Sequence, residues 1–123
     1  MPFSQADTIR AAIDKLEQLP PERRERYFAQ FEEIGHEARW VQVIVGTVNF
    51  AYPYRDDPIE RLESSRVAPL AGMALQEWEH ETNVILTYRG ATSEDVANFV
   101  DALFTRVLNA PSGYRVNVTI EEM

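Results

Sequence analysis

The stretch Trp40-Val41-Gln42-Val43-Ile44-Val45-Gly46-Thr47-Val48-Asn49-Phe50 decides the fold, because it is rich in the β-branched and aromatic residues that favour strands. In an extended chain its apolar side chains alternate between two faces, with Val41, Val43 and Val45 on one face and Trp40, Ile44, Val48 and Phe50 on the other. Because both faces are apolar, we predict one central strand over 40–50 that is covered on both sides.

The chain after this strand alternates between helix and strand patterns. Asp57-Pro58 is typical of a helix start and predicts a short helix that ends at about Ser65. Alternating apolar residues predict strands over 83–89 and 114–121. Apolar residues at spacings of three and four predict a helix over 92–108. The region 40–121 is therefore predicted to form an α/β sheet layer.

Residues 67–80 fit two patterns. Leu70, Met73 and Trp78 have helical spacing, whereas 74–80 also alternates as a strand does. We favour the strand, which makes the order from Trp40 onward β-α-β-β-α-β, the ferredoxin-like order. If 70–79 is helical instead, the sheet has three strands.

The residues before this layer predict two helices. Ala6, Ile9, Ile13 and Leu16 form one apolar stripe over 5–18. Pro20-Pro21 ends this helix and starts a second one over 21–34, which Gly35 ends. We therefore predict a single α+β domain over 1–123, in which a helical hairpin over 1–35 precedes the ferredoxin-like layer.

Charge and composition exclude several partner classes. The 123 residues include 20 acidic and 12 basic residues, so the net charge is −8. This charge is unfavourable for binding nucleic acid or an anionic membrane surface and permits a basic protein partner. No cysteine is present, which excludes disulfides and thiolate chemistry. The start of the sequence has no secretory signal pattern, and no apolar run is long enough to cross a bilayer, so we expect a cytoplasmic protein.

Two Glu-x-x-His pairs are the candidates for a metal site. They are Glu33 with His36 and Glu77 with His80, and their spacing resembles that of carboxylate-bridged di-iron bundles. However, Gly35 should end a helix inside the first pair, and on a strand the second pair would point to opposite faces. We therefore expect no metal and no cofactor.

Catalytic patterns do not stand out in this sequence. No serine lies in a Gly-x-Ser-x-Gly turn, and the five glycines are scattered singly rather than forming a phosphate-binding loop. We therefore assign no catalytic residue and expect a protein that is not an enzyme.

Two segments are the candidates for binding a partner. The first contains Tyr52, Tyr54, Arg55, Asp56 and Asp57, because tyrosine and arginine often anchor protein contacts. In the second, the three carboxylates of Glu77, Glu79 and Glu81 surround Trp78 and should share one face of a strand. Packing of the aromatic residues against the core, and protection of a sheet edge by the acids, are the alternative interpretations.

These features favour a small acidic inhibitor that neutralises a basic partner such as a nuclease toxin, as immunity proteins do. The first alternative is a small ligand-binding or enzymatic ferredoxin-like domain with a pocket between residues 52–57 and the sheet. The second is a structural or regulatory subunit that forms a homodimer through its sheet edges or its helical hairpin.

Overall fold

The computed structural model describes residues 5–123, which form an α+β structure with an open antiparallel sheet of six strands and four helices. The helices are α1 (Gln5–Glu17), α2 (Pro21–Arg24), α3 (Pro58–Ser64) and α4 (Ser93–Ala102), which continues as the π-helical turn η1 (Leu103–Val107). The strands are β1 (Tyr27–Glu33), β2 (His36–Ile44), β3 (Thr47–Ala51), β4 (Ala74–Glu79), β5 (Asn83–Thr87) and β6 (Val116–Glu122).

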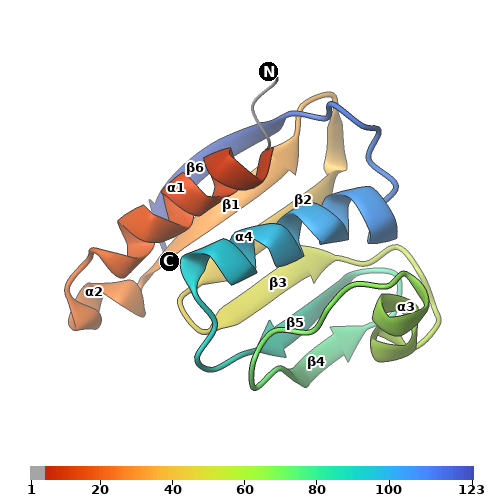
Figure 1. Cartoon of the computed structure of the whole chain (residues 1–123), viewed down its shortest axis with the longest axis horizontal. Coiled ribbons are helices and arrows are strands. Elements are labelled where there is room, and N and C mark those ends of the chain that lie inside the picture. The colour runs from red at the N-terminus through yellow and green to blue at the C-terminus, as the bar shows by residue number, and fades with distance from the viewer. Residues whose placement is uncertain (1–4) are drawn as a thin grey trace.

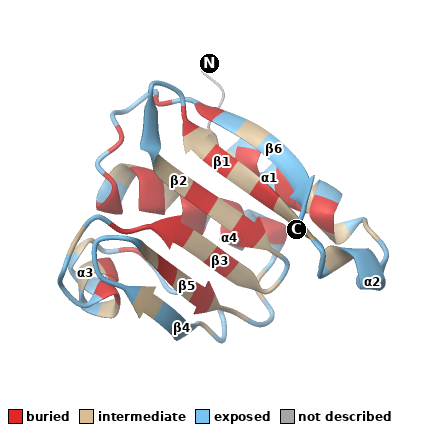
Figure 2. Ribbon diagram, turned by 180° about the vertical axis from the view of Figure 1, so that it is seen from behind, coloured by how far each residue is buried: buried red, intermediate tan, exposed pale blue. Residues whose placement is uncertain are grey.

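The strands lie in the order β4-β5-β3-β2-β1-β6, and every neighbouring pair is antiparallel. Helices α1 and α4 pack side by side across one face of this sheet, and α3 lies beside β4 (Figure 1). The opposite face carries no helix among the described residues (Figure 2). We call this second face the open face. Strands β4 and β6 form the two edges of the sheet.

The hydrophobic core lies between the sheet and the two long helices. Alternate residues of each central strand point toward the helices, as the pleat requires. The helices contribute the apolar stripes that their spacing predicts. Fully buried side chains from both layers include Ile9, Ile13, Leu16, Phe31, Val43, Val48, Phe50, Val84, Leu86, Val96, Val100 and Phe104.

The predicted N-terminal helical hairpin is wrong. Its first helix exists as α1, but the second stops at Arg24 and the chain then forms β1. Residues 1–4 of the predicted hairpin lie outside the described part. The strand pattern was hidden because one of the four inward-facing side chains of β1, after Tyr27, Ala29 and Phe31, is the carboxylate of Glu33.

The predicted single strand over 40–50 is also wrong, because this stretch is a β-hairpin. Ile44 pairs with Thr47 across a two-residue turn, in which Gly46 has a φ of +94° that favours glycine. The turn reverses the alternation, so Val43 and Val48 are paired and both face the helices. Before the turn the odd-numbered residues face the helices, and after it the even-numbered residues do. When the stretch is treated as one strand, these two apolar series fall on opposite faces, so both faces appear apolar.

The other predicted elements are observed, but the ferredoxin-like layout is not confirmed. Residues 74–79 form β4 rather than a helix, so the three-stranded alternative is wrong. The short helix after Asp57, the strand at 83–87, the helix from Ser93 and the last strand are all present. The sheet has six strands, and β1 and β2 lie between β3 and β6. Only the α+β class is therefore confirmed.

Within residues 5–123, no helix combines the length and the apolar character that a membrane crossing requires.

Candidate functional site at the open face and its acidic edge

The two segments predicted to bind a partner lie against each other. The N–H of Tyr52 donates to the carbonyl oxygen of Thr82 at 3.1 Å, and the N–H of Glu81 donates to that of Tyr54 at 3.1 Å. The guanidinium Nε of Arg55 lies 3.3 Å from a carboxylate oxygen of Glu81. Residues 52–57 and 77–82 therefore form one region, which we call the acidic edge.

The tyrosines of the acidic edge point inward. Tyr52 is only 1% exposed, and its hydroxyl donates to the carbonyl oxygen and to Oδ1 of Asp56 at 2.9 and 3.0 Å. Burial, together with the hydrogen bond to Asp56, raises the pKa of Tyr52 to about 12, so this hydroxyl remains a donor at neutral pH. The hydroxyl of Tyr54 donates to the carbonyl oxygen of Val107 at 2.5 Å. Both rings fix the shape of the edge.

The two aspartates of this segment are also engaged within the chain. The carboxylate of Asp56 accepts hydrogen bonds from Arg61, whose guanidinium lies 3.5 Å from the centre of the Tyr54 ring. Asp57 caps α3, because its Oδ1 accepts from the backbone N–H of Ile59 at 2.8 Å. The side chain of Arg55 is 78% exposed, so its charge lies at the surface.

The three carboxylates over 77–81 do not share one face. Glu77 and Glu79 pair with Ile85 and Asn83 and lie on the open face. Glu81 lies in the following turn with a φ of +59°, so the prediction that all three carboxylates share one face is wrong. The turn begins directly after Glu79 and changes the direction of the chain there.

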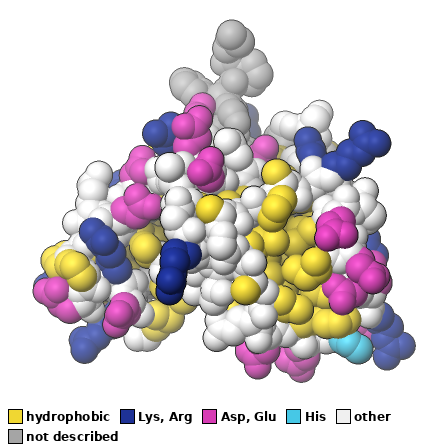
Figure 3. Space-filling view, turned by 60° about the horizontal axis from the view of Figure 1, so that its bottom comes forward, with side chains coloured by type: hydrophobic (Ala, Val, Ile, Leu, Met, Phe, Trp, Pro, Cys, Tyr) yellow, Lys and Arg dark blue, Asp and Glu magenta, His cyan; other side chains and the backbone are white. Residues whose placement is uncertain are grey.

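Trp78 lies on the other side of β4, where the apolar surface is only partly covered. Its ring contacts those of Tyr52 and His80, with centroids 6.4 and 4.5 Å apart. Its indole Nε1 is buried without a hydrogen-bond partner among the described residues. Figure 3 shows hydrophobic side chains gathered on this end of the molecule with acidic side chains around them. Leu75, which is 38% exposed, belongs to this side of β4.

The two Glu-x-x-His pairs do not come together. Glu33 is 2% exposed, and its carboxylate accepts two hydrogen bonds from Arg39 at 3.0 and 3.1 Å, while Nε2 of His36 lies 3.6 Å away. Glu77 and His80 lie at the opposite side of the sheet, with β5, β3 and β2 between β4 and β1. In the described range, no three histidine or carboxylate side chains are grouped so that they could hold a metal ion.

A row of side-chain amides crosses the open face. Gln30 donates to Glu32 at 2.7 Å, Gln42 donates to Gln30 at 3.2 Å, Asn49 donates to Gln42 at 3.2 Å, and Asn83 donates to Asn49 at 2.9 Å. The row links four adjacent strands, β1, β2, β3 and β5. Gln30, Gln42 and Asn49 each use a donor and an acceptor within the row, and Asn83 uses a donor, which fixes the orientation of these amides.

The charges at the paired strand positions of the open face all have one sign; Arg115 precedes β6 and lies just outside these positions. The strand register arranges the side chains of this face in three rows, each of which crosses the sheet from β6 to β4. The first row contains Glu121, Phe28, Ile44, Thr47, Thr87 and Ala74. The second contains Thr119, Gln30, Gln42, Asn49, Ile85 and Glu77, and the third contains Asn117, Glu32, Trp40, Ala51, Asn83 and Glu79. The charged members are Glu32, Glu77, Glu79 and Glu121, and no lysine or arginine occupies these positions. Half-buried apolar side chains, including Trp40 and Ile85, lie between the carboxylates.

Sequence reasoning missed this face, although a signal was present. Gln42 and Asn49 are single amides inside otherwise apolar strands, and Gln30 and Asn83 occupy similar positions. An amide at such a position indicates a strand face that is exposed to solvent, because burying a polar group without a hydrogen-bond partner is unfavourable. The signal was lost because 21–34 was assigned to a helix and 40–50 to one strand.

A cavity of about 470 Å³ lies elsewhere, between residues 66–71 and α4. Its lining includes Arg66, Asn98 and Arg106, and Arg106 donates to the carbonyl oxygen of Arg66 at 2.6 Å. The ligand pocket considered from the sequence was placed instead between residues 52–57 and the sheet.

Comparison with protein-family models, with curated proteins and with solved structures found no match to this chain.

Proposed function

We propose that this chain is a non-catalytic protein-binding domain that neutralises a basic partner through its open face. The observation that carries the proposal is the charge of that face, which has Glu32, Glu77, Glu79 and Glu121 and no lysine or arginine in its strand positions. A surface whose charges all have the same sign raises the association rate with an oppositely charged partner and fixes the orientation of that partner.

The rest of the open face suits a protein contact. The half-buried side chains of Phe28, Trp40, Ile44 and Ile85 supply apolar area between the carboxylates. The amide row offers hydrogen-bonding groups that are already oriented, so less conformational entropy is lost on binding. Such a face suits a partner with a cationic site surrounded by apolar groups. A nuclease, whose cationic site receives phosphates, is a partner of this kind.

The acidic edge extends this surface around β4. Arg55 forms an ion pair with Glu81 in the turn that follows β4, and Trp78 lies between Glu77 and Glu79 along this strand. We propose that the exposed Arg55 and Glu81 and the partly exposed Trp78 contact the partner, and that Tyr52, Tyr54, Asp56 and Asp57 maintain the shape of the edge.

The charge distribution disfavours self-association through the open face. Two copies packed face to face would bring carboxylates from both copies together without a lysine or arginine at any paired strand position of either surface, and like charges in such contacts are strongly unfavourable. A basic partner removes this repulsion, which favours the inhibitor over a face-to-face homodimer.

Capture from an extract of the native host tests the proposal. We expect the wild-type bait to retain a basic protein that elutes as salt is raised to about 0.5 M, because screening weakens contacts between exposed charges. The variant Glu32→Lys/Glu77→Lys/Glu79→Lys should lose this protein. The control Glu22→Lys/Glu25→Lys/Glu63→Lys makes the same charge change away from the open face and should keep it. Retention of the protein by the open-face variant, or recovery of no basic protein by the wild type, would contradict the proposal.

A small-ligand site is the second candidate function. The cavity beside α4 is lined by two arginines, by apolar side chains that include Leu70 and Phe99, and by Asp95, whose carboxylate belongs to the capping box of α4. The excess of cationic groups suits a small anion with an apolar body. A thermal-shift screen with carboxylates and phosphate esters checks this candidate. Stabilisation that disappears in Arg106→Ala would support it, and a silent screen would remove it.

A further inference from the structure

The outer edge of β6 carries unused backbone groups. The N–H of Met123 donates to the carbonyl oxygen of Arg26 at 2.7 Å, and the N–H of Ile34 donates to that of Arg115 at 2.8 Å. Odd-numbered residues of this strand therefore direct their backbone groups toward β1, because successive residues in an antiparallel pair alternate. The N–H and C=O groups of Val116, Val118, Ile120 and Glu122 consequently point away from the sheet.

A contact from α1 supports this assignment. The outward N–H of Val116 donates a hydrogen bond to the side-chain oxygen of Gln5 at 3.2 Å. The outward N–H groups of Val118, Ile120 and Glu122 have no such partner within residues 5–123. The outward backbone groups of these three residues can therefore form hydrogen bonds with another strand.

The two sheet edges differ in how they are protected. Strand β4 has a bulge between Leu75 and Glu77 and exposed carboxylates, which are common ways of preventing edge-to-edge pairing. Strand β6 pairs with β1 over Val116–Glu122 without a bulge, contains no proline or lysine, and has carboxylates only at its last two residues, Glu121 and Glu122. Of the two edges, β6 is therefore the one that can be extended.

An apolar groove follows this edge. It has a volume of about 550 Å³ and lies between α1 and β6. Val118 and Ile120, which is 37% exposed, form one wall. The α1 wall consists of Thr8, Ala11, Ala12 and Lys15. The small side chains on this wall leave room for apolar side chains from an added strand.

We propose that β6 binds β6 of a second copy, antiparallel, about a two-fold axis at Thr119. In this register Val118 lies opposite Ile120 of the partner subunit, and Glu122 lies opposite Val116 of the partner subunit. About six backbone hydrogen bonds form while Gln5 keeps the N–H of Val116. The partner subunit's Val118 and Ile120 enter the groove beside Ala11.

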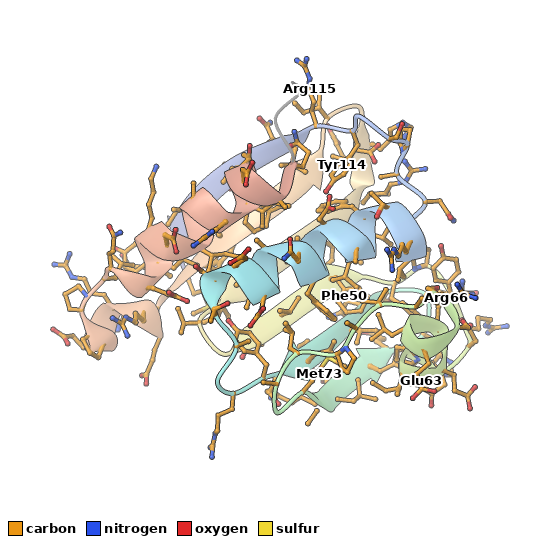
Figure 4. The ribbon with its side chains drawn as sticks, in the orientation of Figure 1. Phe50, Glu63, Arg66, Met73, Tyr114 and Arg115 are labelled. Carbon is orange, nitrogen blue, oxygen red and sulfur yellow. The ribbon has the colours of Figure 1, made fainter. Side chains whose placement is uncertain are left out.

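Charge complementarity favours a second copy over an unrelated strand. Arg115 is exposed, extends away from the sheet in Figure 4 and has no ion-pair partner in the described part of the chain. The two-fold axis places it diagonally across from Glu121 of the partner subunit on the same side of the sheet, within reach of a long side chain. This pair occurs twice. No carboxylate lies directly opposite another carboxylate in this register.

The dimer does not depend on the proposed inhibitor function. It joins two sheets at β6 and leaves both open faces and both β4 edges accessible. Loss of the dimer therefore leaves the capture experiment unaffected, and failure of that experiment leaves the dimer unaffected.

Analytical ultracentrifugation of the full chain at about 100 µM tests the proposal. We expect a dimer of twice the 14.1 kDa chain mass for the wild type. Ile120→Pro should be a monomer with an unchanged far-UV spectrum, because its N–H points away from β1 and proline is tolerated on that side of an edge strand. A monomeric wild type, or a dimer that persists in folded Ile120→Pro, would overturn the proposal.

A charge exchange tests the register without relying on proline. Arg115→Glu should weaken the dimer at least tenfold, because it places two carboxylates diagonally across the two-fold axis. The double variant Arg115→Glu/Glu121→Arg should restore the dimer to within about threefold of the wild type, since the same pair then forms with its charges exchanged. Failure of this restoration would exclude the register and with it the proposed dimer.

Discussion

The variant Glu32→Lys/Glu77→Lys/Glu79→Lys is expected to bind decalysine about 100-fold more weakly than the wild type. Each glutamate contributes about 1 kcal/mol to an exposed contact at low salt, because two charges 4 Å apart in water interact with about that energy. Three reversals together therefore weaken binding by at least two powers of ten. Isothermal titration calorimetry at an ionic strength of about 20 mM measures the effect.

The control for this prediction separates local from global charge. Glu22→Lys/Glu25→Lys/Glu63→Lys changes the net charge by the same amount, from −8 to −2, at exposed positions away from the open face. We expect it to weaken decalysine binding less than about fivefold, since only the long-range attraction falls. An equal loss of affinity in the two variants would show that decalysine binding depends on the net charge of the protein rather than on the open face.

Replacement of Arg39 by methionine is expected to destabilise the fold by about 3 kcal/mol. The carboxylate of Glu33 is 2% exposed and depends on two hydrogen bonds from Arg39. Removing one partner of a buried pair leaves an uncompensated charge and costs about 3–5 kcal/mol. We expect the lower end of this range because the side chain of Arg39 is 28% exposed and His36 remains nearby. Urea denaturation followed by circular dichroism gives the free energy of unfolding.

The double variant Glu33→Met/Arg39→Met is the matched control. It removes both charges, and buried ion pairs replaced by apolar side chains of similar size often cost little. We expect it to lose less than about 1 kcal/mol and to be more stable than Arg39→Met alone. If the double variant is the less stable of the two, the unpaired carboxylate is not the cause of the loss.

The secondary structure was predictable where local pattern and tertiary role agree. Asp57 caps α3 as expected, and Thr92 and Asp95 form the capping box at the start of α4. Prediction failed where one residue has an exceptional role. Glu33 hides the alternation of β1 because its partner, Arg39, lies on the next strand. Gly46 divides 40–50 because the turn places two apolar series on the same face.

The candidate site was predictable only in part. The sequence selected residues 52–57 and 77–81, and the structure brings them together. Burial of Tyr52 depends on Trp78 and other distant residues, which no local pattern shows. The amide row depends on the register of β1, β2, β3 and β5, and that register could not be derived while β1 was assigned to a helix.

The most direct test of the proposed basic-partner site is an NMR titration of the ¹⁵N-labelled protein with decalysine, followed through the side-chain amide signals. We expect the largest shifts at Gln30, Gln42, Asn49 and Asn83 on the open face, with little change at Asn98 on α4 and at Gln18 just after α1. Larger shifts at Asn98 and Gln18, or equal shifts at all six, would contradict the proposed site.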